Sequence, residues 1–444
     1  MSLVPSRRLL WLVFAVALLA TVAGPLPEFM PFWLLGILAA GLAALGDLAA
    51  CLAGARPPEV SLPPVARFTK DRMGSVRLTF ANPGAFAWRI RLALGLPPEF
   101  VSRDEELRVN LPAGSSRAGI DWHCTPRRRG RFRTAVACVE TDSRFGLWHL
   151  RTRRALPCEL RVYPNLFLGA GRLTALTLAR GEGGIRVQRT IGRGREFEKL
   201  RDYLPGDSFD EIHWKATAKR NRPITKVFQV ERTQELYVIL DSSRLSGRLI
   251  EERGHSQTAL EGYLTAALVL MLAAEKQGDR FGLVAHDDRV RVFLRAGHSE
   301  AHYAACREAV LTLEPSERTP DMAEIVRHLC AHLRRRALLF FLTDLSDPVL
   351  AEDFARHARV LSRQHLVFVC QMRAPGVAPL FEGEDVGSEA EVYRRLAGHL
   401  RWSELRGLSQ RLKPAGVTAE LLNQETMAAE LVSRYLQVKR RQAL

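Results

Sequence analysis

The chain has 444 residues, with 64 Lys and Arg against 48 Asp and Glu, which gives a formal net charge of +16. A composition of 47% hydrophobic and 25% charged residues excludes a largely disordered chain, and the length leaves room for two or three domains. The positive charge predicts an anionic partner, either nucleic acid or the inner surface of a membrane. Seven cysteines without a CxxC pair argue against a disulfide framework or a zinc site.

Two apolar runs open the chain, at residues 9–24 and 32–54, and Asp47 is the one charge in the second run. A spanning helix needs about 20 apolar residues, and the linking segment 25–31 has three prolines and no Lys or Arg. Basic residues flank the pair: Arg7, Arg8, Arg56, Arg67, Lys70 and Arg72. The positive-inside rule then predicts a transmembrane hairpin over residues 1–56 with both ends in the cytoplasm. A signal peptide cleaved near residues 21–23 is the alternative.

Residues 57–165 change to short segments of alternating polarity, at 76–80, 88–92 and 132–139, separated by turn residues. This spacing predicts a β-sandwich domain. The arginine-rich run at 127–133 is a candidate nucleic-acid patch, although a turn with solvated arginines is the commoner structure.

A linker and a polar block with fixed aromatic positions follow over residues 166–232. The block reads Glu196-Phe197, Leu200-Arg201-x-Tyr203, Pro205-Gly206-Asp207, Ile212-x-Trp214-Lys215-Ala216 and Val227-Phe228, and the next strand ends in Asp241-Ser242-Ser243. This order resembles the bacterial domain-of-unknown-function family fifty-eight. The resemblance implies a von Willebrand factor A-like domain after the block. It also implies that the protein works with a MoxR-type AAA+ ATPase in the assembly or maturation of other proteins.

Strands and helices alternate over residues 233–444. Fully apolar runs at 236–240, 337–342 and 366–369 are typical of strands covered on both faces, and helical periodicity lies between them. The pattern predicts a doubly wound, mostly parallel sheet, an α/β fold of the Rossmann-like class. The expected helices cover residues 259–274, 299–313, 322–335, 389–412 and 426–438.

Ligands of such sheets bind at the carboxyl ends of the strands. The resemblance implies a metal-ion-dependent adhesion site there, made by Asp241, Ser243, Thr319 and Asp344, with Leu245 in place of the second serine. Carboxylate and hydroxyl oxygens suit Mg²⁺ or another divalent cation. The alternative is that Asp241, Ser243 and Asp344 cap the following helices and the domain is free of metal.

The block itself predicts a partner-binding surface made by Arg201, Tyr203, Gly206, Asp207, Trp214 and Lys215. In this interpretation the aromatic residues are buried anchors and the charged residues point outward. A hydrolase using Asp207, Asp210 and His213 is the competing hypothesis, although the chain has no GxSxG motif. The leading prediction is a non-enzymatic interaction protein, anchored in the bacterial inner membrane with soluble domains in the cytoplasm. A basic nucleic-acid-binding protein is the third hypothesis.

Overall fold

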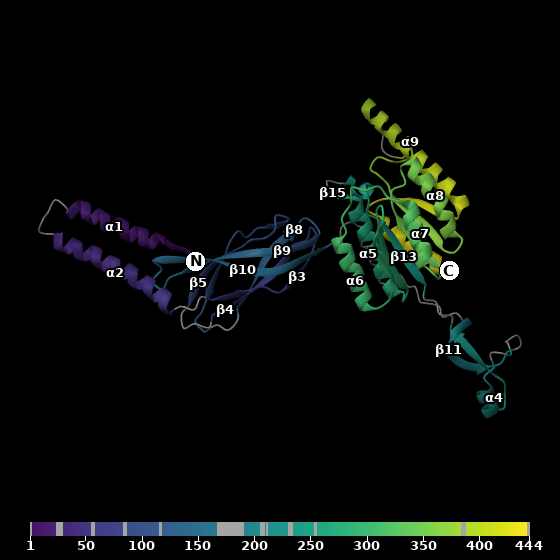
Figure 1. Ribbon diagram of the computed structural model, residues 1–444, viewed down its shortest axis with the longest axis horizontal. Helices are drawn as coiled ribbons and strands as arrows, with labels where there is room; N and C mark the ends of the chain where they lie inside the picture. The colour runs from purple at the N-terminus through teal and green to yellow at the C-terminus, as the bar shows by residue number, and fades with distance from the viewer. Residues whose placement is uncertain are drawn as a thin grey trace. The chain divides into compact units, whose positions relative to one another are not determined.

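The computed structural model of the chain is shown in Figure 1. It describes residues 2–23, 30–54, 58–82, 87–114, 118–166, 191–204, 209, 212–229, 234–252, 255–382 and 388–441. The chain divides into two compact units, Met1–Asn165 and Leu166–Leu444.

The first unit begins with a short strand and two helices: β1 (Ser2–Pro5), α1 (Arg7–Ala23) and α2 (Met30–Gly54). Within α2 the segment Met30–Ala50 is long and apolar enough to cross a membrane, and only 6% of its most apolar stretch is buried. At 1.5 Å per residue the 17 residues of α1 span about 25 Å, a little less than a bilayer core.

Two antiparallel-rich sheets make up the rest of the first unit. Their strands are β2 (Glu59–Ser61), β3 (Val65–Thr69), β4 (Gly74–Ala81), β5 (Trp88–Leu94), β6 (Phe100–Ser102), β7 (Leu107–Leu111), β8 (Ala118–Pro126), β9 (Gly130–Asp142) and β10 (Trp148–Tyr163). One sheet has the order β1-β10-β9-β5-β7, with β3 beside β10, and the other has the order β2-β4-β8-β6. Alternate residues of β4 and β5, such as Leu78 and Leu92, fill one shared core.

The N-terminal strand β1 is a feature that the sequence did not predict. It pairs antiparallel with β10, so that Ser2 lies opposite Arg151 and Pro5 opposite Trp148. The residues before α1 therefore belong to the β-rich part of the first unit.

In the second unit the polar block forms its own small sheet from β11 (Ile191–Asp202) and β12 (Ile224–Gln229), with helix α4 (Trp214–Arg220) between them in sequence. Ile212 and Ile224 are its buried apolar residues in the described part. Residues 167–190, in the predicted linker, lie outside the described residues.

The remainder of the second unit is built on a six-stranded sheet of order β17-β16-β13-β18-β19-β20, in which only β17 runs antiparallel to its neighbour. The strands are β13 (Glu235–Asp241), β16 (Arg280–His286), β17 (Val290–Gly297), β18 (Ala337–Leu342), β19 (Leu366–Met372) and β20 (Val417–Leu422). A separate hairpin joins β14 (Leu249–Glu252) to β15 (His255–Thr258).

Helices cover both faces of this sheet (Figure 1). They are α5 (Ala259–Lys276), α6 (Glu300–Thr312), α7 (Met322–His332), α8 (Pro348–Ser362), α9 (Glu389–Leu412) and α10 (Met427–Arg440). Leu236, Val238 and Leu240 pack in the core with α5, α6 and α10. Tyr237 and Ile239 pack in the core with α7, α8 and α9. Two covered faces explain why the strand is apolar throughout.

Candidate functional site

Buried polar side chains gather where the parallel strands end. Asp241, the last residue of β13, is fully buried. Its Oδ1 accepts the backbone N–H of Ser243 at 2.8 Å, and its Oδ2 accepts the hydroxyl of Thr343, which follows β18, at 2.7 Å. Both carboxylate oxygens are thus satisfied by the turns that follow two neighbouring strands.

His286 ends the next strand and lies in register with Asp241. Burial lowers the pKa of His286, and the Asp241 carboxylate opposes that shift only in part. The imidazole Nε2 is buried with no hydrogen-bond partner among the described residues. A neutral imidazole therefore stands beside a buried carboxylate at this edge.

Asp344 lies at the same edge, after β18, and its carboxylate is fully engaged. Oδ1 accepts the backbone N–H of Ser346 at 2.9 Å and the amide of Gln371 at 2.6 Å. Oδ2 lies 3.3 Å from the guanidinium Nη1 of Arg248. The charge of Asp344 is therefore balanced by a side chain of this chain.

The two hydroxyls of the predicted set are also occupied. The Ser243 hydroxyl accepts the N–H of Leu245 at 3.3 Å and caps the short 3₁₀ helix Arg244–Gly247. The Thr319 hydroxyl accepts the Nε–H of Arg244 at 3.3 Å. Ser246, one place beyond Leu245, donates its hydroxyl to the Ser243 carbonyl at 2.8 Å.

Two of the predicted metal ligands, Asp241 and Asp344, lie near the same tyrosine. Burial raises the pKa of Tyr263 well above its usual value, and the Asp344 and Asp241 carboxylates raise it further, so both acids lie near one phenol. Among the described residues no three acidic, His or Cys side chains form a group that could hold an ion. Arg248 lies against Asp344 and Arg244 against Thr319, so two of the four predicted ligands contact guanidinium groups of this chain.

The predicted partner-binding surface is described for Arg201, Tyr203, Trp214 and Lys215, whereas Gly206 and Asp207 lie outside the described residues. The expectation that Trp214 is a buried anchor is wrong, because its side chain is 67% exposed. Trp214 is the first residue of α4, a helix without a buried residue, and Ile212 and Ile224 provide the burial instead. Phe209 is 73% exposed, and its ring centroid lies 6.3 Å from that of Tyr203.

His213, the described member of the hydrolase hypothesis, has a structural role. Its Nδ1 accepts the backbone N–H of Ala216 at 3.0 Å and so caps α4. Asp207 and Asp210 lie outside the described residues.

The arginine-rich run at residues 127–133, which suggested nucleic acid, forms the turn between β8 and β9 and the first residues of β9. Arg129 is buried there, and Arg127 pairs with Asp71 at 3.3 Å. These two arginines therefore have structural roles in the sandwich domain. The expectation that the arginines of the turn are solvated is wrong for Arg129.

A second polar site, at the helix ends of the first unit, was missed by the sequence reasoning. Asp47 of α2 is buried, and its carboxylate accepts the Ser143 hydroxyl and the N–H groups of Phe145 and Leu147, the last two at 3.0 and 3.2 Å. The start of α1 holds the same loop, because the Ser6 hydroxyl donates to the Gly146 carbonyl at 2.6 Å. The feature of the sequence that could have indicated this site is Asp47, the lone acidic residue within an apolar run.

Residues 199–383 match the family described as "Protein of unknown function DUF58", which supports the resemblance seen in the block. A curated relative, "Uncharacterized protein YeaD" of Bacillus subtilis (strain 168), is 38% identical over 53 residues. That alignment covers 12% of this chain and 13% of the relative, so this chain spans a small part of the relative's length.

Three solved structures show remote likenesses to this chain. An uncharacterized membrane spanning protein from Vibrio fischeri has 13% identity and a TM-score of 0.18, over 47% of this chain and 98% of that chain. Proximal thread matrix protein 1 from the mussel byssus has 8% identity and a TM-score of 0.27, over 46% and 45%. WR4, a C. elegans MSP family member, has 9% identity and a TM-score of 0.16, over 23% and 96%. These scores are low and carry no inference about this chain.

Proposed function

We propose that this chain is an interaction protein anchored in the bacterial inner membrane, with its folded units in the cytoplasm. In this proposal it works with a MoxR-type AAA+ ATPase in the assembly or maturation of other proteins. The ATPase partnership rests on the family resemblance alone, whereas the anchor and the interaction surface rest on the geometry described above.

The observation that carries the proposal is the exposure of α2. Most of the Met30–Ala50 segment is uncovered by protein. Exposed side chains along it include Phe32, Leu35, Leu38, Leu42 and Leu45. A contiguous apolar surface of this size in water would drive association, and a lipid bilayer covers it without cost.

The hydrogen bonds at the helix ends support a hairpin rather than a single span. The beginning of α1, through Ser6, and the end of α2, through Asp47, hold the same loop of the sandwich, residues 143–147. A hairpin of two spanning helices, joined on the other side of the membrane, places both of these helix ends at the sandwich. If α1 were cleaved off as a signal peptide, β1 would be lost with it, because β1 precedes α1, and β10 would lose its strand partner.

The distribution of basic residues supports a cytoplasmic location for the sandwich. Arg7 and Arg8 are the first two residues of α1, and Arg67, Lys70 and Arg72 follow α2, whereas residues 25–31 have no Lys or Arg. The side of a hairpin that carries Lys and Arg faces the cytoplasm.

The second unit supports a von Willebrand factor A-like domain whose metal site is degenerate. Its sheet is parallel apart from the edge strand β17, with helices on both faces and polar residues at the carboxyl edge. In this proposal the Arg248 guanidinium takes the role of the cation beside Asp344. The alternative, a divalent ion held by Asp241, Ser243, Thr319 and Asp344, requires Arg248 and Arg244 to move away.

The polar block is the proposed partner surface. Exposed Trp214 and Phe209 lie in a segment that also carries Arg201 and Lys215. Trp, Tyr and Arg are the residues that most often dominate binding energy at protein interfaces, and fixed charges around them give specificity. Exposed aromatic residues suit this role better than the buried anchors expected from the sequence.

The proposal is tested by photo-cross-linking of the full chain in native membranes. A photoreactive amino acid at position 214 is compared with one at Val360, an exposed position on α8. We expect a MoxR-type ATPase to be linked from position 214 and not from position 360. Equal linkage from both, or none from position 214, rejects the partner surface.

A reporter that is active only outside the cell, fused after residue 165, should be silent, and its activity would reject the orientation.

A further inference from the structure

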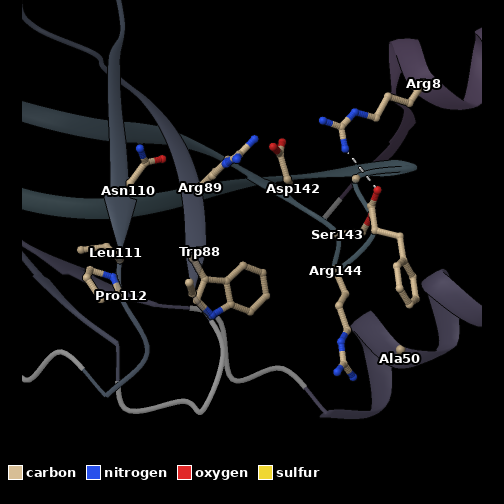
Figure 2. Close-up of a pocket in the computed structure, with 13 residues that line it drawn as sticks. Arg8, Ala50, Trp88, Arg89, Asn110, Leu111, Pro112, Asp142, Ser143 and Arg144 are labelled. Atoms are coloured by element: carbon tan, nitrogen blue, oxygen red, sulfur yellow. Dashed lines mark hydrogen bonds between the residues drawn. The ribbon is translucent and has the colours of Figure 1, made fainter.

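The first unit contains a cavity of about 660 Å³ at the membrane end of the sandwich. Its wall comes from the start of α1, the end of the apolar part of α2, the neighbouring strands β5 and β7, the end of β9, and the loop at residues 143–146 (Figure 2). No part of this cavity belongs to the carboxyl-edge site or to the polar block. The family resemblance assigns nothing to it.

Three guanidinium groups line the cavity, from Arg8, Arg89 and Arg144, against one carboxylate, from Asp142. The Asp142 carboxylate lies within hydrogen-bond distance of the His149 imidazole, with Nδ1 and Oδ1 2.8 Å apart. In Figure 2 the Arg8 side chain reaches from α1 toward the loop, where Nη1 lies 3.5 Å from the Phe145 carbonyl. The charged groups that line the cavity are therefore mostly cationic.

The cavity also has an apolar part. Trp88 is buried in its wall, and Leu111 and Pro112 lie beside it. Phe145 is 64% exposed although its backbone N–H is fixed by Asp47. Inorganic phosphate would use the guanidinium groups and leave most of this volume and the apolar wall unused. A larger ligand with a phosphate and a glyceryl or acyl part matches both halves.

Its place in the fold fits such a ligand. Arg8 is the second residue of α1, and Ala50 is the last residue of the apolar segment of α2, so the cavity lies where both helices would leave the bilayer. Anionic headgroups of the inner leaflet occupy this depth, and basic pockets beside spanning helices bind them. Trp at the same level is typical of the membrane interface.

We propose that this cavity binds the phosphate headgroup of an anionic phospholipid, with Arg89 and Arg144 as its main phosphate ligands and Trp88 against the glyceryl part. The proposal rests on the membrane anchor proposed above. Arg8 contributes charge and also holds the loop, so it is unsuitable for a clean substitution.

The test uses the full chain in nanodiscs of phosphatidylcholine with a minor fraction of phosphatidylglycerol, and lipids retained on the protein are identified by native mass spectrometry. We expect phosphatidylglycerol to be enriched on the natural chain. Arg89→Gln and Arg144→Gln should each lower the apparent affinity about fivefold, the effect of one basic residue at an anionic surface. Arg133→Gln is the matched control, because Arg133 is an exposed arginine near the start of β9, whereas Asp142 ends that strand.

Equal enrichment in the natural chain and the Arg89→Gln, Arg144→Gln double variant overturns the proposal. So does a loss of enrichment in Arg133→Gln as large as in the double variant. If inorganic phosphate or glycerol phosphate in lipid-free detergent raises the melting temperature as much as phosphatidylglycerol does, the ligand is a soluble phosphate and the lipid source is rejected. Extraction of the natural chain from membranes by alkaline carbonate overturns the anchor itself, which separates that failure from failure of the cavity alone.

Discussion

The Ser143 hydroxyl donates a hydrogen bond to the Asp47 carboxylate, 96 residues earlier in the chain. The same carboxylate accepts the N–H groups of Phe145 and Leu147, and the Trp148 indole donates to the Ala44 carbonyl at 2.9 Å. An acid in an apolar helix, which suggests a headgroup contact or an intramembrane site, thus fixes the helix to a folded domain. The sandwich loop satisfies a charge that would be costly to bury alone.

Replacing Asp47 by Ala should release residues 143–147, because three donors lose their acceptor at once. Hydrogen bonds to a charged group contribute roughly 1.5–3 kcal/mol each, so the loss of three costs at least about 4.5 kcal/mol and makes local opening roughly a thousandfold more frequent. Limited proteolysis of the loop in detergent measures this. Asp47→Asn keeps one oxygen acceptor, so its cleavage rate should lie between those of the natural chain and Asp47→Ala. Identical cleavage rates in all three chains would show that the loop is held by other contacts.

Replacing Trp214 by Ala should leave stability within about 0.5 kcal/mol, because the side chain is mostly exposed. Ile224→Ala, in the buried part of the block, should instead destabilise it by roughly 2–4 kcal/mol. Partner capture should fall at least about thirtyfold in Trp214→Ala, as for an interface hot spot. Thermal unfolding and a quantitative pull-down separate the two effects. A Trp214→Ala chain that unfolds early would restore the buried-anchor interpretation.

Strand positions were the most predictable part of the fold, because a strand covered on both faces must be apolar along its length. Residues 236–240 and 337–342 lie in β13 and β18 for this reason. Helix α8 was missed although its apolar face is buried, and so was β1, which is only four residues long. The identity of β1 as a strand depends on a partner, β10, that lies almost 150 residues later in sequence.

Within the candidate site, the sequence predicted which polar residues end the strands but not what they contact. Asp241 and Asp344 do lie at the carboxyl edge, as their positions after apolar runs indicate. The partner of Asp344 is Arg248, which follows a short 3₁₀ helix and has no motif of its own. Side-chain pairing of this kind depends on loop geometry, which local sequence patterns do not specify.

Mg²⁺ should leave the melting temperature of the natural full chain in detergent unchanged, because Arg248 already balances Asp344. Arg248→Ala should create a stabilisation of about 1.4 kcal/mol once the Mg²⁺ concentration is tenfold above the Kd, since a ligand of the native state raises its stability. Arg248→Lys keeps a cation and should show no such gain. Asp344→Asn added to Arg248→Ala should abolish it. A rise in the melting temperature of the natural chain would instead support a bound divalent ion.

Stability of the second unit should fall as the pH is lowered below about 6.5, because of His365. Its buried imidazole Nδ1 accepts the backbone N–H of Ala337 at 3.2 Å, a bond that requires the unprotonated nitrogen. Burial lowers the pKa of His365, and the neighbouring Arg336 lowers it further. Between this lowered value and about 6.5, the unfolded chain binds a proton that the native chain does not, so the free energy of unfolding rises with pH.

The slope in this window should approach at most about 1.4 kcal/mol per pH unit for one histidine, and it should level off below the native pKa. His286, whose pKa burial also lowers, adds a second contribution of the same sign. His365→Asn keeps an acceptor oxygen but does not titrate, so denaturant unfolding of this variant between pH 5 and pH 7.5 should show a shallower slope. An unchanged slope in His365→Asn would mean that His365 does not couple folding to protonation, and a steeper one would mean that its proton stabilises the native state.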